Sequence, residues 1–266
     1  MIREQIEAAL LGLMEGLTEF LPVSSTGHLI LLGDFLAFNG PPGRVFEVVI
    51  QLGAILAVCW TYRQRLGGVI AGMHRDAEAR RFAAAVGIAV LPAMVLGALL
   101  HTLIKTYLFN PWTVAGALVV GGIAILAIER KTRMATVSDV SGISSRRALG
   151  IGLCQAVAMF PGVSRSGATI MGGLLLGLDR KTATEFSFFL AIPTMLGAAA
   201  FDIYKNRGSL TFDGSTLIAI GFLSAFLAAF FTIRLAIGFI SRHGFAPFAW
   251  YRIALGTLML GILAAR

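Results

Sequence analysis

The chain is poor in charged residues for its length. Of its 266 residues 14% are charged, whereas 57% are hydrophobic, and the mean hydropathy is +0.82. No soluble domain needs that much apolar surface, so a polytopic helical membrane protein is predicted. Short alternating segments of the kind that build an outer-membrane barrel are also absent, which argues against that class.

Cysteine is scarce as well. Cys59 and Cys154 are the two cysteines, and both lie in apolar stretches. They are interpreted as small core residues, so neither a disulfide nor a cysteine metal site is expected. The first residues lack the basic start and the cleavage site of a signal peptide, since Glu4 and Glu7 soon follow Arg3.

The apolar residues are gathered in long runs. Six of these are predicted to cross the membrane as helices: 46–62, 82–100, 111–128, 186–203, 215–240 and 248–265. Two further regions, 2–38 and 148–178, are interrupted by proline and by clusters of hydroxyl residues. Each is predicted to be a re-entrant hairpin of two short helices, which is tolerated at membrane depth only where protein or water covers the bend. The expected fold is therefore an all-α polytopic membrane protein with six transmembrane helices and two re-entrant helical hairpins.

The net charge of +8 arises from basic residues placed beside the apolar runs. This placement indicates membrane topology and anionic headgroups rather than a nucleic-acid partner. Arginines and lysines concentrate after Tyr62 and again after Ile128, in segments expected to be loops. By the positive-inside rule both segments are cytoplasmic, and the first hairpin then enters the membrane from the outer face.

The two halves of the chain repeat at an offset of 140 residues, and no gap is needed from the pair Gly12 and Gly152 to the pair Phe46 and Phe186. Chance agreement between two glycine- and leucine-rich segments is the alternative, and the shared Phe-x-x-Val-Ser-x-x-Gly order argues against it. Each half holds one hairpin and three spans, an odd number, so the second copy must be inverted in the membrane. The prediction is one membrane domain, 1–266, built from two inverted repeats, 1–140 and 141–266. Matching pairs include Gly12 and Gly152, Phe20 and Phe160, and Ser24 and Ser164.

Charged residues occur inside both predicted hairpins. A charged side chain at bilayer depth costs about 2.5–3.5 kcal/mol, so Glu15, Glu19 and Arg165 must be solvated, paired or bound to a ligand. Glu15 and Glu19 are four residues apart and share one helix face. Two such carboxylates repel unless a cation lies between them, and Mg²⁺ or Ca²⁺ combines carboxylates with substrate phosphates. Solvated glutamates near the surface are the alternative.

Each hairpin also supplies the start of a helix. Pro22 allows a new helix to begin at Ser24-Ser25-Thr26, and Ser164-Arg165-Ser166 is the matching start in the second half. Helix capping is the simplest role for these hydroxyls. Two helix N-termini that meet beside an arginine would also form a pocket for a polyanion.

His28 follows Ser25 by three positions and Ser24 by four, so the three side chains share a face. A single histidine in an apolar helix is more often a hydrogen-bonded structural residue. Beside serines, glutamates and an arginine, acid/base or nucleophilic work is favoured.

The segments Glu15–His28 and Pro161–Thr169 resemble the two signature motifs of the undecaprenyl-pyrophosphate phosphatase family, the bacitracin-resistance type. The similarity continues through 46–56 and 185–193, so it covers most of the chain. This resemblance implies an inner-membrane hydrolase of bacterial peptidoglycan synthesis that removes the terminal phosphate of undecaprenyl pyrophosphate and recycles the lipid carrier. It also implies dependence on a divalent cation, an active site open to the periplasmic face, and a homodimer.

The residues and the resemblance together give a hypothesis for the chemistry. Glu15 and Glu19 hold the cation, and Glu19 also acts as base. Ser25 is the favoured nucleophile with His28 as its acid/base partner, although attack by water or by His28 itself fits the same residues. The residues expected to bind the diphosphate are Ser24, Thr26, Ser164, Arg165, Ser166 and Thr169.

Two other functions fit parts of the pattern. A secondary transporter or lipid flippase would also use inverted repeats and broken helices. Such a protein has no need of carboxylates, serine, histidine and arginine assembled together. The other class of membrane lipid phosphatases has similar short motifs, but no histidine follows Ser164-Arg165 at a useful spacing.

Overall fold

The computed structural model describes residues 2–38, 45–131, 135–205 and 214–265, apart from the side chains of residues 101, 102 and 105. Of the residues that it describes, 85% are helical. In the described part the one β-type contact is an isolated bridge between Val137 and Leu178. The predicted all-α class is therefore confirmed. In chain order the helices are α1 (Ile2–Thr18), α2 (Ser25–Leu36), α3 (Val45–Thr61), α4 (Arg63–Gly72), α5 (Ala77–Tyr107), α6 (Pro111–Lys131), the short 3₁₀ helix η2 (Val140–Gly142), α7 (Ser145–Val157), α8 (Arg165–Leu175), α9 (Arg180–Lys205), α10 (Ser215–His243) and α11 (Ala246–Ala265).

Every predicted span corresponds to a helix. Five described helices, namely α5, α6, α9, α10 and α11, are long and apolar enough to cross a membrane. The remaining one, α3, has 17 residues, which is the short end of the range for a span. It is followed by α4 at an angle of 74°, and the bent pair brings the number of candidate spans to six. The chain is thus a multi-pass membrane protein.

The basic segment after Tyr62 is not the loop that was expected. It forms α4, and the hydrogen bond from the Leu66 amide to the Tyr62 carbonyl (2.9 Å) carries the helical ladder across the bend. Arg65 in this helix packs over the ring of Phe82 and donates to the Ser141 hydroxyl (3.2 Å). A basic segment can be helical here because the long arginine stem packs on apolar residues while its charge finds polar partners.

Several helices extend past the apolar runs that predicted them. α5 begins at Ala77 instead of residue 82, because the Asp76 carboxylate caps it by accepting from the amides of Glu78 (3.0 Å) and Ala79 (3.3 Å). An apolar run marks only the part of a helix that needs lipid or core around it. Capping residues in the flanking polar segment decide where the helix begins.

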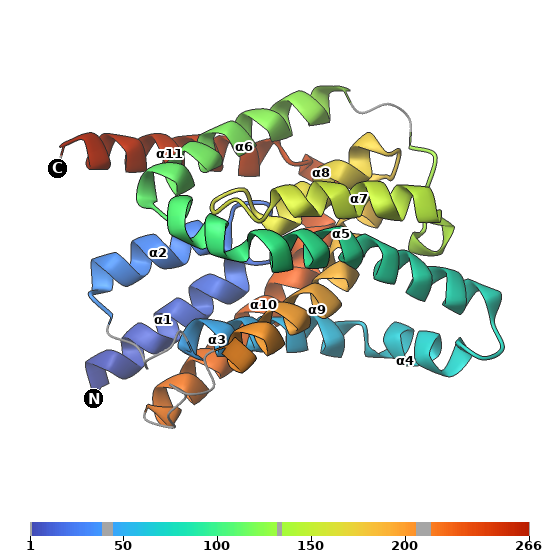
Figure 1. Cartoon of the computed structure of the whole chain (residues 1–266), viewed down its shortest axis with the longest axis horizontal. Helices are drawn as coiled ribbons and strands as arrows, with labels where there is room; N and C mark the ends of the chain where they lie inside the picture. Colours follow the sequence, from blue (N-terminus) through green and yellow to red (C-terminus); the bar gives the residue numbers. More distant parts are fainter. Residues whose placement is uncertain (1, 39–44, 132–134, 206–213, 266) are drawn as a thin grey trace.

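The helices pack closely through small residues. α1 lies against α10, α10 also contacts α3, α5 contacts α7 and α9, and α6 runs beside α11 (Figure 1). A Cβ added at Gly16 would come within 2.7 Å of Ala228 on α10, and one at Gly152 would come within 2.5 Å of the Ala89 carbonyl on α5. These glycines therefore permit the close approach that helix pairs in membranes commonly use.

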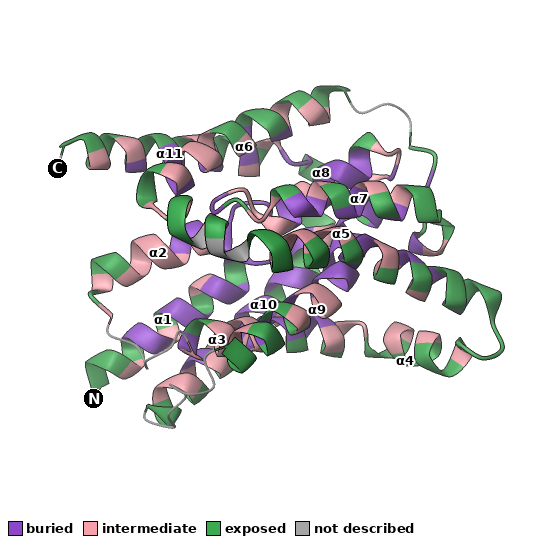
Figure 2. Cartoon of the chain, viewed as in Figure 1, coloured by how far each residue is buried: buried purple, intermediate pink, exposed green. Residues whose placement is uncertain are grey.

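The buried residues gather on the inward sides of the helices (Figure 2). Many large apolar residues are exposed on the surface of the molecule. Trp60, Leu235 and Leu258 are each more than half exposed. An apolar outer surface of this extent suits lipid rather than water. The helix breaks expected within 2–38 and 148–178 are present, at residues 19–24 between α1 and α2 and at residues 158–164 between α7 and α8.

Candidate active site

Each of the two breaks ends on a serine in an uncommon backbone conformation. Ser24 and Ser164 both adopt a positive φ, 70° and 72°, and each immediately precedes a helix. Such a conformation is uncommon outside glycine and costs on the order of 1–3 kcal/mol, so the surrounding structure must enforce it. Pro22 and Pro161 precede these serines and prevent the helices from simply continuing. Each break therefore ends at the N-terminus of a helix, α2 after the first break and α8 after the second.

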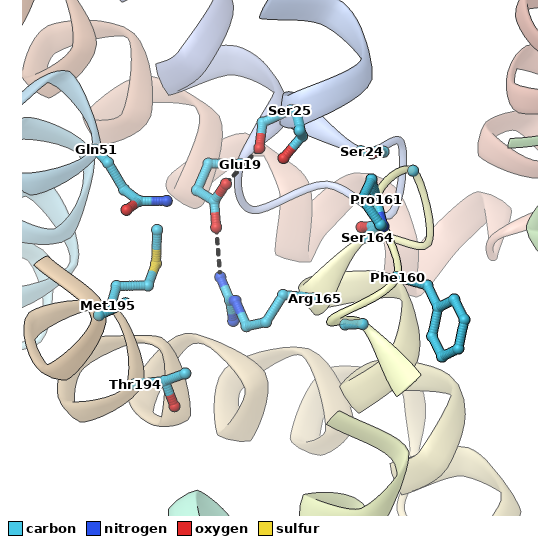
Figure 3. A pocket seen from close by; sticks show the side chains of 14 residues that line it. Glu19, Ser24, Ser25, Gln51, Phe160, Pro161, Ser164, Arg165, Thr194 and Met195 are labelled. Carbon is cyan, nitrogen blue, oxygen red and sulfur yellow. Dashed lines mark hydrogen bonds and ion pairs between the residues drawn. The ribbon is translucent and has the colours of Figure 1, made fainter. Parts of the chain in front are cut away.

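Between the two breaks lies a pocket of about 170 Å³ (Figure 3). Glu19 is at its centre, with Ser25 on one side and Arg165 on the other, and Gln51 and Met195 form the opposite wall. Its lining residues are Glu19, Ser24, Ser25, Thr26, Gln51, Ala158, Phe160, Pro161, Gly162, Ser164, Arg165, Thr194, Met195 and Ala198. Four of the six residues expected to bind the diphosphate thus line the pocket, together with Glu19 and the expected nucleophile Ser25: Ser24, Thr26, Ser164 and Arg165.

Glu19 connects the two halves of the site. Its Oε2 accepts a hydrogen bond from the Ser25 hydroxyl (2.5 Å), and its Oε1 accepts one from Nη2 of Arg165 (3.1 Å). Glu19 is 7% exposed, so the carboxylate is largely removed from water. The ion pair with Arg165 and the hydrogen bond from Ser25 therefore hold the Glu19 carboxylate between these two side chains.

Arg165 is held on its other side by α9. Its Nη1 donates to the carbonyl (2.7 Å) and to the hydroxyl (3.3 Å) of Ser187. Its Nε is buried and has no hydrogen-bond partner among the described residues. The guanidinium is thus fixed in place at the pocket wall, and a planar guanidinium suits the oxygens of a phosphate. Ser187 is a site residue that the motif analysis missed, although a serine within an apolar span was a signal.

Ser166 and Thr169 differ from the expectation. Both are 1% exposed and neither lines the pocket. Ser166 donates to the carbonyl of Leu21 in the other break (2.7 Å), and the Thr169 hydroxyl lies 2.7 Å from that of Ser187. In this structure these hydroxyls hold the two breaks and α9 together, and their hydrogen-bonding capacity is used within the protein.

His28 lies one turn after Ser25 but is hydrogen-bonded elsewhere. Its Nδ1 is 2.8 Å from the Ser24 carbonyl oxygen and its Nε2 is 2.7 Å from the Tyr251 hydroxyl of α11. It is not among the pocket-lining residues. Within the described part, the partner of the Ser25 hydroxyl is Glu19. The expected Ser25–His28 pair is therefore not formed in this structure.

Glu15 and Glu19 are the two carboxylates expected to hold a divalent cation. Glu15 is 2% exposed, and its Oε2 has no hydrogen-bond partner among the described residues. A buried carboxylate oxygen of this kind needs either a proton or a cation. No group of three or more histidine, cysteine or acidic side chains able to hold a metal occurs in the described ranges. Glu19 lines the pocket and Glu15 does not, so a cation on this pair would have to take most of its ligands from water and substrate phosphates, as Mg²⁺ commonly does.

Arg252 of α11 is a second buried arginine, and the motif analysis missed it. It is 1% exposed, and its guanidinium donates only to backbone carbonyls. A charged residue inside the apolar run 248–265 was the signal that could have found it. The acceptors are the carbonyls of Pro22 (3.1 Å) and of Gly162 (3.0 Å) and Val163 (3.1 Å) in the two breaks, and those of Ala117 (3.1 Å) and Leu118 (3.4 Å) on α6. One side chain therefore ties both breaks to α6 and α11.

Replacing Arg252 by methionine is expected to lower the free energy of unfolding, because several backbone carbonyls lose their donor at once. Methionine fills much of the volume but leaves the carbonyls without donors, and each such loss costs about 1–3 kcal/mol. A loss of roughly 3 kcal/mol would lower the unfolding temperature by roughly 10 °C. The measurement is thermal unfolding in detergent, with Arg234→Met, an exposed arginine of α10, as the matched control. Equal unfolding temperatures for Arg252→Met and the wild type would contradict this role.

Comparison of the sequence with known proteins identifies the family of this chain. The pattern of the family described as bacitracin resistance protein BacA matches residues 8–258. A relative from Paramagnetospirillum magneticum, named undecaprenyl-diphosphatase 2, is 58% identical over 261 residues, which cover 98% of this chain and 100% of the relative. Relatives named undecaprenyl-diphosphatase from Aromatoleum aromaticum (53% identical; 95% of this chain, 92% of the relative) and Cupriavidus metallidurans (50%; 96% and 94%) match comparably. The chain belongs to the BacA family of bacitracin resistance proteins.

Proposed function

We propose that this protein is a membrane hydrolase that removes the terminal phosphate of undecaprenyl pyrophosphate. The products are inorganic phosphate and undecaprenyl phosphate, so the reaction recycles the lipid carrier of cell-wall synthesis. The observation that carries the proposal is the buried series Ser25–Glu19–Arg165, which combines a nucleophile, a base and a phosphate-binding cation in one pocket. The names of the relatives agree with this chemistry.

The geometry supports a serine route. The Ser25 oxygen attacks the terminal phosphorus while its proton passes to Glu19, to which it is already hydrogen-bonded at 2.5 Å. The bond between this phosphorus and the bridging oxygen breaks, and undecaprenyl phosphate leaves. Glu19 passes the proton from Ser25 to the departing undecaprenyl phosphate and is again a carboxylate. Water then attacks the phosphoserine and gives a proton to Glu19, the bond between phosphorus and the Ser25 oxygen breaks, Glu19 returns the proton to that oxygen, and inorganic phosphate is released. Direct attack by water activated by Glu19 uses the same residues.

The charge of the phosphates is met from several directions. Arg165 supplies a fixed guanidinium, while Ser24, Thr26 and Ser164 line the pocket beside the N-termini of α2 and α8. Backbone amides at helix N-termini favour anions, and donors fixed before the reaction are the main source of transition-state stabilisation in phosphoryl transfer. A role of Ser166 and Thr169 in binding would require their present hydrogen bonds to open.

A divalent cation is part of the proposal. Glu15 and Glu19 would hold it, and Oε2 of Glu15, which has no hydrogen-bond partner in the described part of the chain, supports this assignment. When bound, Mg²⁺ or Ca²⁺ neutralises charge on the diphosphate.

Two inverted repeats, 1–140 and 141–266, with a re-entrant hairpin in each are also proposed. In these repeats α1 corresponds to α7, α3 to α9 and α5 to α10. The contact of α1 with α10 then corresponds to that of α7 with α5, and the contact of α3 with α10 corresponds to that of α9 with α5. The matched serines Ser24 and Ser164 share their positive φ. These correspondences support a common origin of the halves within one membrane domain.

The proposed location is the bacterial inner membrane with the pocket open to the periplasmic face. Single cysteines in a Cys59- and Cys154-free background test this orientation. We expect Asn110→Cys, between α5 and α6, and Glu4→Cys, at the start of the first hairpin, to react with a membrane-impermeant maleimide in intact cells. Arg75→Cys, before α5, and Arg146→Cys, at the start of the second hairpin, should react only after permeabilisation. Reaction of Glu4→Cys and Arg146→Cys from the same side would contradict the inversion.

A homodimer belongs to the same proposal and rests on the family resemblance alone. Light scattering of the detergent-solubilised protein distinguishes the mass of one chain, 28.2 kDa, from that of two. A mass of one chain at all concentrations would remove the dimer from the proposal.

The activity itself is tested by phosphate release from undecaprenyl pyrophosphate by the purified protein. We expect release with Mg²⁺ or Ca²⁺ and loss of release with excess chelator, because two carboxylates beside a diphosphate need a counter-charge. Release that persists with chelator would keep the hydrolase and remove the cation. No release from folded protein, together with lipid counterflow in liposomes, would favour the transporter or flippase instead.

A further inference from the structure

A hydrogen-bonded series runs from the C-terminal helix into the first break. The Tyr251 hydroxyl on α11 is 2.7 Å from Nε2 of His28, and Nδ1 of the same imidazole is 2.8 Å from the Ser24 carbonyl oxygen. The two rings are nearly parallel, with an interplanar angle of 7°. His28 is 5% exposed, whereas Tyr251 is 48% exposed. Residues 223 positions apart in the sequence are thus joined through one buried imidazole.

The partners of His28 define where its proton lies. A carbonyl oxygen can only accept, so Nδ1 carries the hydrogen that is shared with Ser24. No carboxylate contacts His28 in the described part of the chain, and Arg252 follows Tyr251 in α11. A buried imidazolium would therefore lack a counter-charge, which favours the neutral ring. In the neutral ring Nε2 accepts the Tyr251 O–H, so both nitrogens are already committed.

The residue at the end of this series is strained. Ser24 has a positive φ of 70° and its side chain makes no capping hydrogen bond to α2. Its carbonyl accepts the first backbone bond of the helix only weakly, at 3.4 Å from the His28 amide, compared with 2.8 Å for the imidazole Nδ1. The imidazole therefore supplies the stronger of the two contacts that hold the Ser24 peptide in place.

We propose that Tyr251 is a positioning residue of the hydrolase: through His28 it fixes the Ser24 carbonyl and, with it, the start of α2 that carries Ser25. Arg252 supports this proposal, because its guanidinium donates to the carbonyl of Pro22 (3.1 Å), two residues earlier in the same break. Adjacent residues of α11 thus hold the backbone on both sides of Val23. Ser25 then meets Glu19 at 2.5 Å, and His28 acts by holding the backbone rather than by transferring a proton.

The first test is Tyr251→Phe, which removes the hydroxyl and keeps the ring. The inference rests on the proposed hydrolysis, so wild-type phosphate release from undecaprenyl pyrophosphate is measured first, and no release there would count against the function rather than against Tyr251. We expect kcat to fall about five- to tenfold, the effect of losing one hydrogen bond on the reacting geometry, with KM changed less than about twofold. The control is Trp250→Phe, because Trp250 is the exposed neighbour on α11 and should behave like the wild type. Wild-type kcat in Tyr251→Phe would overturn the proposal.

The second test separates positioning from acid/base chemistry by rescue. In His28→Asn the side-chain amide can still donate to the Ser24 carbonyl four residues back, whereas in His28→Gln the longer amide cannot take the Nδ1 position. We expect the asparagine variant to keep activity near that of Tyr251→Phe and the glutamine variant to fall about tenfold further. Adding Tyr251→Phe to His28→Asn should then have no effect, because the series is already broken. Equal inactivity of both His28 variants would overturn the proposal and restore His28 as an acid/base.

A spectroscopic readout tests the tautomer directly. In protein labelled with ¹⁵N at its four histidines, the His28 signal is assigned by its loss in His28→Asn. We expect it to show a protonated Nδ1 and an unprotonated Nε2, and Tyr251→Phe should shift the Nε2 resonance. A His28 signal with its proton on Nε2, unaffected by Tyr251→Phe, would contradict the series.

Discussion

Replacing Arg165 by alanine is expected to lower kcat/KM for undecaprenyl pyrophosphate by about 10³-fold or more, the range found when a phosphate-binding arginine is lost in phosphoryl transfer. The reason is twofold. The substrate loses the fixed guanidinium that lines the pocket, and Glu19 loses the ion pair at 3.1 Å that holds its carboxylate beside Ser25. The measurement is the initial rate of phosphate release by purified protein in detergent with saturating Mg²⁺.

Two companion variants separate charge from geometry. Arg165→Lys keeps a cation but not the fork that reaches Glu19 and Ser187 together, so most of the loss should remain. Arg234→Ala, at an exposed arginine of α10, should retain wild-type activity. Unfolding temperatures identify any variant that fails because Glu19 is left buried and unpaired, and the double variant Arg165→Ala with Glu19→Gln removes that charge. Wild-type turnover in folded Arg165→Ala would remove the phosphate clamp from the mechanism.

Replacing Glu19 by glutamine is expected to lower kcat by about 10²–10⁴-fold, the usual contribution of a general base. The amide has nearly the same shape, and its oxygen can still accept from Ser25, but it cannot take the proton that Ser25 must lose. The 7% exposure of Glu19 makes replacement of this base by bulk water ineffective. The matched control is Glu78→Gln, an exposed acid at the start of α5 that should be silent.

The same experiment defines the nucleophile when Ser25 is included. Ser25→Ala should lose activity to a similar extent, and acid quench of the wild type with substrate labelled in its terminal phosphate should yield phosphoserine at residue 25. Phosphohistidine in the quenched protein would contradict the serine route. Turnover of Ser25→Ala close to the wild type, with Glu19→Gln inactive, would instead assign the attack to water activated by Glu19.

The sequence alone determined that this is a helical membrane protein, where two of its segments break, and which charged residues those segments carry. Long apolar runs predicted the membrane helices because lipid demands continuous apolar length, and Pro22 and Pro161 predicted the two breaks because proline interrupts a helical ladder. The cost of charge in an apolar segment singled out Glu15, Glu19 and Arg165. The same rule, applied to the apolar run 248–265, also singles out Arg252, so the sequence contains the signal for this residue.

Tertiary packing decided which of these groups meet. Glu19 pairs with Arg165 across 146 positions and His28 with Tyr251 across 223, and no periodicity encodes contacts at such separations. Shared helix faces predicted a Ser25–His28 pair, but the bend at residues 19–24 turns Ser25 toward Glu19 and leaves His28 to α11. Likewise Ser166 and Thr169 meet Leu21 and Ser187 only because the two breaks and α9 pack together. Local patterns fix which side chains a segment carries, whereas the partners of a buried polar group depend on how whole helices come to rest against each other.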